Sequence, residues 1–237
     1  MKKEKETAGK HHREILKKLE EAAGGCEYRP ESLGTSKFCY QISVPVRRKI
    51  VREWTKTSDI SPDEFIGLLD LLYRGRSHEE ISFAGLLLEG MPALRKTVPP
   101  EKLEEWLNYT EGWAEVDSLC QSNFSAAEMF EKWNKWKKLL EKLSQNPNPH
   151  KIRASMVLLV KPSRESSDPR ISDLALTTIE RHKEKTNILI TKAISWLLRS
   201  LIVNHRPEVE EYLSKNRLTL PKIAVRETER KLLTGKK

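Results

Sequence analysis

The chain has 237 residues, of which 38% are hydrophobic and 32% are charged, and its formal net charge is +9. This length allows one large domain or two small domains with a buried core. The charged N-terminal residues contain no apolar segment, so we expect no signal peptide. The longest apolar run, Met156–Val160, is too short to cross a bilayer. The excess of basic residues favours a polyanionic partner such as nucleic acid.

The cysteines and histidines do not form a metal site in the sequence. Cys26, Cys39 and Cys120 are odd in number and widely spaced, no CxxC pair occurs, and the six histidines lack ligand spacing. We therefore expect no zinc or other metal. Scattered free thiols are typical of a reducing compartment, which predicts a cytoplasmic protein.

Helical periodicity extends over the whole chain, and no stretch alternates in the manner of a strand. Several helix starts carry N-cap signals, namely Ser61 before Pro62, Ser125 three residues before Glu128, and Asp168 before Pro169. The predicted helices are His12–Ala23, Pro45–Thr55, Pro62–Tyr73, His78–Glu89, Pro100–Asn108, Trp113–Ser122, Ala126–Ser144, His150–Val160, Asp168–His182, Asn187–His205, Pro207–Lys215 and Pro221–Leu233. We expect an irregular loop over Gly24–Ser43, and an all-α fold overall.

Pairs of these helices recur about every 35–45 residues, which is the range of HEAT-like repeats. The spacing alone leaves two architectures open, a curved solenoid and an ordinary all-α globule. A solenoid has a concave face that can wrap a rod such as duplex DNA.

The first candidate site is the basic segment Ser43–Lys49, which opens a helix at Pro45. The amides of the first turn, together with Arg47 and Arg48, predict a phosphate site. The alternative is a solvated charged face.

The second candidate lies in Gly112–Cys120. Trp113 and Asp117 are four residues apart and therefore share one helical face, with Val116 and Cys120 beside them. A carboxylate in these surroundings is partly desolvated, and it suits the stabilisation of a developing positive charge. The alternative is a structural aspartate that caps a helix or pairs with an arginine across a repeat.

The third candidate opens the segment that begins at Lys151. Arg153 lies in the first turn of a helix that is apolar nearly all round, so the helix is internal and Arg153 is expected at the border of core and surface. It is predicted either to pair with Asp117 or to hold a phosphate. Lys161, at the far end of the helix, is expected to reach the backbone to which that phosphate belongs.

The fourth candidate is the helix over 187–205. Its apolar stripe consists of Ile190, Ile194, Leu197, Leu201 and Ile202. Trp196 points roughly 140° away from that stripe and shares its face with Lys192 and Arg199. An indole between two cations suits a flat, anionic partner such as nucleic acid. The alternative is packing against a neighbouring repeat.

Motifs for nucleotide-dependent or metal-dependent catalysis do not occur. The sequence lacks GxxxxGKS/T, GxGxxG, HExxH and GxSxG, so we expect no cofactor. We predict a basic N-terminal tail over 1–13, a single domain over 14–233 and a basic C-terminal tail over 234–237. Nothing in the pattern suggests self-association, so we expect a monomer.

The order of these segments resembles the AlkD-like DNA alkylation repair family, which is built from HEAT-like repeats. The resemblance covers about residues 38 to 233. It is carried by PVRRK (45–49), GWAEVDS (112–118), IRASMVLL (152–159), KAISWLLR (192–199) and KIAVRE (222–227). It implies a curved solenoid with a concave basic face, acting on duplex DNA that contains alkylated bases, and hence a nucleoid-associated protein.

Members of this family that are glycosylases remove cationic N3- and N7-alkylated purines. The resemblance implies that Asp117 is the catalytic carboxylate, that Trp113 and Trp196 flank the deoxyribose, and that cations hold the phosphates. These cations are Arg153, Arg199, Lys161 and Arg48, with Arg47 and Lys192 as further expected DNA contacts. Two departures concern substrate range: Gly112 stands where some relatives have a second tryptophan, and Val44 stands where relatives can have a hydroxyl residue. The alternatives are a non-catalytic member that binds damaged or branched DNA and a helical scaffold for protein partners.

Overall fold

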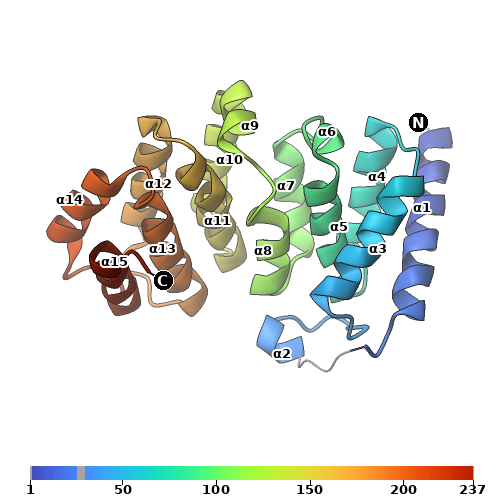
Figure 1. The fold of residues 1–237 in the computed structure, drawn as a ribbon, viewed down its shortest axis with the longest axis horizontal. Helices are drawn as coiled ribbons and strands as arrows, with labels where there is room; N and C mark the ends of the chain where they lie inside the picture. Colours follow the sequence, from blue (N-terminus) through green and yellow to red (C-terminus); the bar gives the residue numbers. More distant parts are fainter. Residues whose placement is uncertain (1, 26–29, 237) are drawn as a thin grey trace. The chain divides into compact units, whose positions relative to one another are not determined.

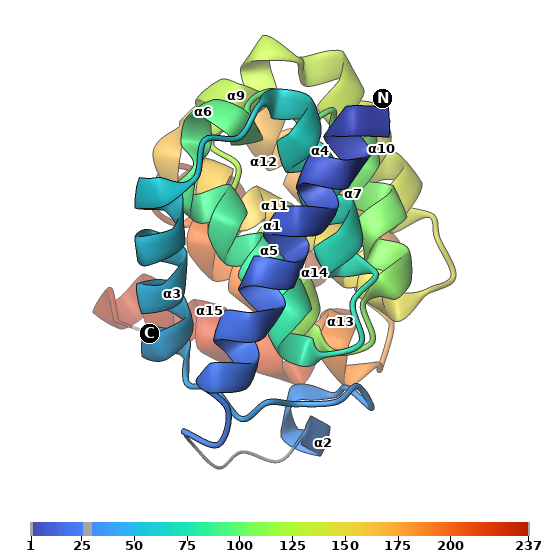
Figure 2. The same cartoon turned by 90° about the vertical axis from the view of Figure 1, so that its right-hand side faces the viewer.

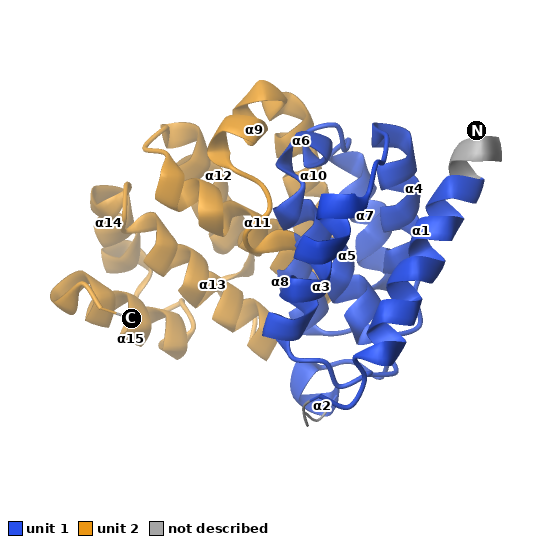
Figure 3. Ribbon diagram, turned by 45° about the vertical axis from the view of Figure 1, so that its right-hand side comes forward, with its two compact units in different colours: residues 1–119 blue, residues 120–237 orange. Residues whose placement is uncertain are grey.

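All the secondary-structure elements in the described part of the chain are helices (Figure 1). The computed structural model describes residues 2–25 and 30–236, and side chains from residue 6 onward. Within these ranges the one β pairing is an isolated bridge between Phe38 and Ser77. The predicted all-α fold class is confirmed. The chain divides into two compact units, residues 1–119 and 120–237 (Figure 3).

Unit 1 consists of two rows of helices. Its elements are α1 (Lys2–Glu21), α2 (Pro30–Leu33), α3 (Val44–Thr57), α4 (Pro62–Tyr73), α5 (His78–Gly90), α6 (Pro92–Arg95), α7 (Glu101–Trp106), η1 (Leu107–Tyr109) and α8 (Trp113–Cys120). Helix α1 packs on α4, and α3 packs on α5. Helix α7 joins α4 because the Trp106 indole donates to Asp70 at 2.7 Å and stacks on Tyr73. Helix α8 joins α5 through the Ser118 hydroxyl, which donates to Ser82 O at 3.1 Å.

Unit 2 repeats this plan. Its elements are α9 (Ala126–Glu131), α10 (Trp133–Ser144), α11 (Pro149–Glu165), α12 (Pro169–His182), α13 (Ile188–Leu201), α14 (Arg206–Asn216) and α15 (Lys222–Thr234). Helix α13 packs between α11 and α15. Helix α12 contacts α10 and joins α14 through the Tyr212 hydroxyl, which donates to Glu180 at 2.7 Å.

Hydrogen bonds between successive repeats give the repeat spacing within each unit. Several of the side-chain bonds join residues 32 or 36 positions apart, among them Asp70–Trp106, Ser82–Ser118, Arg153–Leu189 and Ser195–Glu227. Each links a helix to its equivalent in the next helix pair, so each unit is a stack of helical repeats. The curvature and the concave face expected of a solenoid stay predictions.

The helix starts follow the N-cap signals of the sequence. Ser61 and Ser125 each form a capping box with the glutamate three residues on, and the Asp168 side chain accepts the Arg170 N–H. These contacts satisfy amide groups that the first helical turn leaves without intrahelical partners. Helix α4 therefore begins and ends at the predicted residues, Pro62 and Tyr73.

Several helix boundaries differ from the prediction, and the largest difference is at the N-terminus. Helix α1 begins at Lys2 rather than at residue 12, so most of the expected N-terminal tail is helical. Figure 2 shows α1 lying along α4, where Ala8 is only 1% exposed and a Cβ on Gly67 would lie 3.3 Å from its methyl carbon. This tertiary contact explains why a polar segment is helical. At the other end α15 includes Thr234, the first residue of the expected C-terminal tail.

The helix predicted over 126–144 is two helices. They meet at Lys132, whose φ of −131° and ψ of 38° are not helical. No glycine or proline lies near this position, so periodicity did not reveal the break. The expected loop over 24–43 contains the short helix α2, and another short helix, α6, follows α5. Cys26 lies outside the described residues, and neither Cys39 nor Cys120 forms a disulfide within the described part of the chain.

His182, on α12, should make unit 2 less stable in mild acid. Its side chain is 3% exposed, Nε2 lies 2.9 Å from Ser144 O, and the buried Nδ1 has no partner in the described part of the chain. Burial, followed by the charges of Lys185 and Arg181, lowers the pKa of His182 below its usual 6.5. Below that pH the unfolded chain takes up a proton that the native protein does not, so stability falls as the pH falls from 6.5 toward the native pKa.

The slope attributable to one such proton is at most about 1.4 kcal/mol per pH unit. Urea unfolding of the wild type and of His182→Gln, measured between pH 7 and pH 5, should show a shallower loss of unfolding free energy in the variant. Equal losses in the two proteins would contradict this assignment.

Candidate functional site

Helix α8 presents the predicted carboxylate and indole of unit 1. Trp113 is 39% exposed, whereas Asp117, one turn later, is 8% exposed. Val116 and Cys120 are buried beside them, as the periodicity predicts. A carboxylate that is nearly excluded from water, close to an exposed indole, interacts more strongly with a positive charge than a solvated carboxylate would.

The segment before α3, from the end of α2 onward, holds Trp113 in place. The indole N–H of Trp113 donates to Ser32 O at 2.9 Å. Ser36 donates its backbone N–H and its hydroxyl to Glu111, at 3.0 and 2.7 Å, and Lys37 pairs with the same carboxylate at 3.3 Å. Residues 32–37 therefore form a support for the N-terminus of α8. The sequence predicted only an irregular loop here, because the contacts join positions 74 to 81 residues apart.

Gly112 allows this loop to approach α8. A Cβ at Gly112 would lie 2.3 Å from Leu33 O and 2.9 Å from the carbonyl carbon of Gly34, both of them backbone atoms. Gly34 itself has a φ of 73°, which favours glycine. Glycine at position 112 is therefore a requirement of the packing, because the backbone of residues 33–34 occupies the space of a side chain.

A buried polar network fixes α8 against α5 and α3. Glu115 is fully buried, and one of its oxygens accepts the Glu111 N–H at 2.8 Å while the other lies 3.5 Å from His78 Nδ1. The other ring nitrogen of His78 is 3.4 Å from Nη1 of Arg47, and the same Nη1 donates to the Ser82 hydroxyl. We infer that this network sets the rotation of α8, and with it the position of Asp117. The sequence analysis missed Glu115 and His78, although Glu115 lies on the face of α8 opposite Asp117, where a carboxylate in the core is unusual.

The two arginines predicted to bind phosphate differ in accessibility. Arg47 is 6% exposed and belongs to the buried network, which corrects the expectation that it lies at the surface. Its guanidinium points into the interior because Ser82 and His78 supply partners there. Arg48 is exposed and pairs with Glu89 at 3.0 Å. Arg48 is therefore the better placed of the two to meet an anion.

Helix α11 forms the interior of unit 2. Its residues from Lys151 to Val160 are all buried, as the all-round apolar pattern predicts. Arg153 is 5% exposed, which is deeper than the border position expected, and its Nη1 donates to Leu189 O at 2.9 Å. It thereby holds the first turn of α13. Lys161 is half-buried, and its ammonium donates to Ser122 O at 3.0 Å and lies 3.8 Å from Glu165.

Helix α13 orients Trp196 as its periodicity predicts. All five residues of the predicted apolar stripe are buried. Along the middle of the helix the least buried residues are Lys192, Trp196 and Arg199, which form one stripe of their own. Unit 2 therefore brings together an indole and two cations on one helix face, the arrangement expected of a surface that binds nucleic acid.

Arg199 is held by the last helix. Its guanidinium lies 3.2 Å from Glu227 and also donates to Ser195 O at 3.1 Å. The Ser195 hydroxyl donates to the same carboxylate at 2.5 Å. Glu227 ends the KIAVRE segment, so this segment supplies a support for Arg199 that the sequence analysis did not assign.

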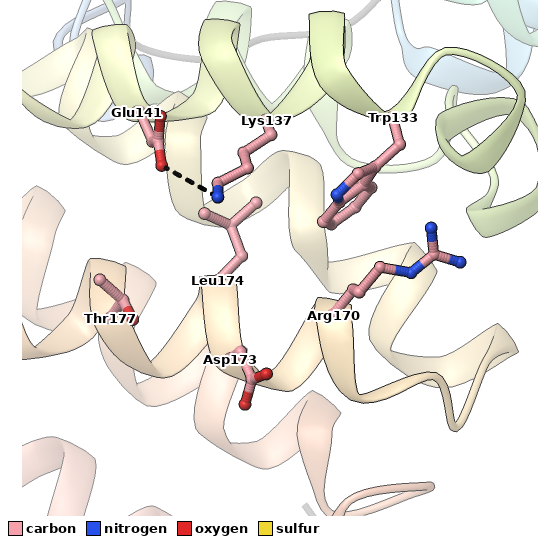
Figure 4. A pocket seen from close by; sticks show the side chains of 7 residues that line it. All are labelled: Trp133, Lys137, Glu141, Arg170, Asp173, Leu174 and Thr177. Carbon is pink, nitrogen blue, oxygen red and sulfur yellow. Dashed lines mark ion pairs between the residues drawn. The ribbon is translucent and has the colours of Figure 1, made fainter.

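A separate depression in unit 2 lies between α10 and α12 (Figure 4). The Arg170 guanidinium lies 4.5 Å from the centre of the Phe130 ring and 5.3 Å from that of Trp133, and it forms an ion pair with Asp168 at 2.7 Å. Lys137 lies 3.9 Å from Glu141. None of the residues predicted for the site lines this depression, so it is not the candidate site.

Two further observations concern the described residues. No group of three His, Cys, Asp or Glu side chains among them is arranged to hold a metal ion. None of their helices is both long enough and apolar enough to cross a membrane.

These features define an all-α helical-repeat protein with aromatic and basic residues at the surface of its helices. The family model for DNA alkylation repair enzymes matches residues 16–232. The chain therefore belongs to the DNA alkylation repair enzyme family, as the motifs predicted. Membership supports the role of an enzyme in DNA repair.

A solved structure has the same fold. It is described as a predicted DNA alkylation repair enzyme from Enterococcus faecalis, and it is 17% identical in sequence to this chain. The TM-score is 0.67, and the match covers 86% of this chain and 93% of the other. A search of curated proteins found no match.

Proposed function

We propose that this protein is a monofunctional DNA glycosylase that hydrolyses the N-glycosidic bond of cationic N3- or N7-alkylated purines in duplex DNA. The observation that carries the proposal is the placement of Asp117, nearly buried and one turn from the exposed indole of Trp113, in a member of the DNA alkylation repair family.

The proposed role of Asp117 is electrostatic. Cleavage of a glycosidic bond places oxocarbenium character on the sugar. A fixed carboxylate stabilises that charge, and it does so more strongly where water is excluded. Asp117 can also orient the attacking water. Trp113 is proposed to pack on the deoxyribose, since an indole face attracts the growing positive charge.

The charge of the substrate explains how one carboxylate suffices. Most glycosidases use a second carboxyl group as a general acid to protonate the leaving group. An N3- or N7-alkylated purine already carries a positive charge and leaves as a neutral base. No general acid is then required, and the reaction needs only the stabilised sugar and water.

The residues of unit 2 and of α3 are proposed to bind the DNA. Trp196 is proposed to contact the DNA through its indole face. The cations proposed to hold phosphates are Arg48, Lys161, Lys192 and Arg199. Arg153, which holds Leu189, is proposed as a positioning residue for α13, and Arg47 as one for α8. We further propose that the protein acts as a monomer on nucleoid DNA in the cytoplasm. Its net charge of +9 supports the attraction to DNA.

The direct test is incubation of the purified protein with a duplex that contains N7-methylguanine. We expect free 7-methylguanine and an equal amount of abasic sites. Binding without release would overturn the proposal in favour of a non-catalytic DNA-binding member of the family. Absence of duplex binding even at low salt would favour a scaffold for protein partners, because phosphate contacts are strongest there.

A further inference from the structure

Arg164, one residue before the end of α11, reaches across to α13. Its Nε and Nη2 both donate to the Ser200 hydroxyl, at 3.2 and 2.9 Å. Ser200 is fully buried, and its own hydroxyl donates to Trp196 O at 2.9 Å. Arg164 as a residue is exposed, and its guanidinium is held at a fixed place beside the turn of α13 that carries Trp196 and Arg199.

The charge of Arg164 is not neutralised by an ion pair within the described residues. Arg199 has Glu227 at 3.2 Å and Lys161 has Glu165 at 3.8 Å, whereas Arg164 is held by a neutral hydroxyl. Burial lowers the pKa of Arg164, and the nearby positive charge of Arg199 lowers it further. Arg164 is bonded to Ser200, the residue that follows Arg199, so two arginines meet at the same turn of α13.

Such an arrangement is unfavourable without an anion. Like charges repel, and an arginine costs side-chain entropy to immobilise, so a fixed and unneutralised guanidinium at a surface suits a phosphate oxygen. Guanidinium N–H groups that Ser200 does not engage remain on Arg164 for such a contact.

We propose that Arg164 and Arg199 together hold one phosphodiester of the bound DNA strand against the C-terminal half of α13. Ser200 positions Arg164 for this contact, and Glu227 positions Arg199. The inference rests on the proposed function for its ligand, a DNA strand, and it adds a residue to which no DNA contact was assigned.

The test is the salt dependence of binding to an unmodified duplex, which requires no excision. Each phosphate contact contributes about 0.9 to the slope of log Kobs against log salt concentration. Arg164→Gln should lower the slope by about that amount and weaken binding roughly tenfold at moderate salt. The matched control is Arg170→Gln, an exposed arginine of the same unit that is paired with Asp168 and should leave the slope unchanged.

Because Arg164 also joins α11 to α13, two further variants keep its charge. Arg164→Lys and Ser200→Ala should keep the wild-type slope while binding more weakly, since the cation is no longer fixed. A wild-type slope for Arg164→Gln, or equal changes in Arg164→Gln and Arg170→Gln, would overturn the proposal.

The outcomes separate this inference from the proposed function. If the wild type binds duplex and Arg164→Gln loses slope while nothing is excised, the Arg164 contact stands and the glycosylase proposal fails. If the wild type excises 7-methylguanine and Arg164→Gln keeps the full slope, the reverse holds. A wild type that does not bind duplex overturns both.

Discussion

Asp117→Asn should stop the release of 7-methylguanine while the protein remains folded and bound to DNA. Asparagine has nearly the same shape but carries no charge, so the oxocarbenium character of the sugar loses its stabilising partner. Removal of one such electrostatic group costs about 100- to 1000-fold in the rate of the chemical step. The measurement is single-turnover excision on N7-methylated duplex, with duplex affinity and melting temperature determined on the same preparation.

The matched control for this variant is Asp173→Asn. Asp173 is an exposed aspartate on α12 that lines the depression of Figure 4. This substitution removes the same charge from α12, a helix to which no role in DNA binding or excision is assigned. It should leave the excision rate unchanged. Undiminished release by Asp117→Asn would refute the role of this carboxylate, whatever the DNA affinity of the variant.

Gly112→Ala should damage both stability and excision. The new Cβ would meet Leu33 O at 2.3 Å, so residues 33–34 must move away from α8. Overpacking of this kind costs about 1–3 kcal/mol of unfolding free energy. The movement also weakens the bond from the Trp113 indole to Ser32 O, and a misplaced positioning group costs about 100-fold in rate.

Urea unfolding and single-turnover excision test this prediction. The control is Gly9→Ala in α1, where a Cβ meets only the end of the Arg13 side chain at an ordinary 3.5 Å. Alanine inside a helix is more stable than glycine by about 0.5–1 kcal/mol, so this variant should gain stability and keep its activity. A Gly112→Ala protein as stable and as active as the wild type would show that the loop does not support α8.

The buried network around Glu115 gives the same helix a second support from inside unit 1. The segment over residues 32–37 holds α8 at its exposed N-terminus, whereas Glu115 and His78 hold it from the core. These two contacts act on opposite sides of a helix of only eight residues. A short helix has little stability of its own, so tertiary contacts must fix the position of its carboxylate.

The amino-acid sequence by itself determined the helices and the direction of the key side chains on them. Trp196 was placed opposite the apolar stripe of its helix, and Trp113 beside Asp117, because the helical repeat of 3.6 residues relates neighbours three and four positions apart. N-cap residues such as Ser61 marked helix starts because their side chains accept hydrogen bonds from amides of the first turn, which is also a local interaction.

Only the tertiary structure decided which polar groups lie inside and which segments support the site. Arg47 and Arg48 are adjacent in sequence, yet one is buried against Ser82 and the other is exposed beside Glu89. The helical start of α1 depends on Ala8 packing near Gly67, and the place of Trp113 depends on Ser32. These contacts join positions about 35 to 80 residues apart, and local periodicity carries no information on which distant group supplies a partner for a buried charge or a close neighbour for a helix.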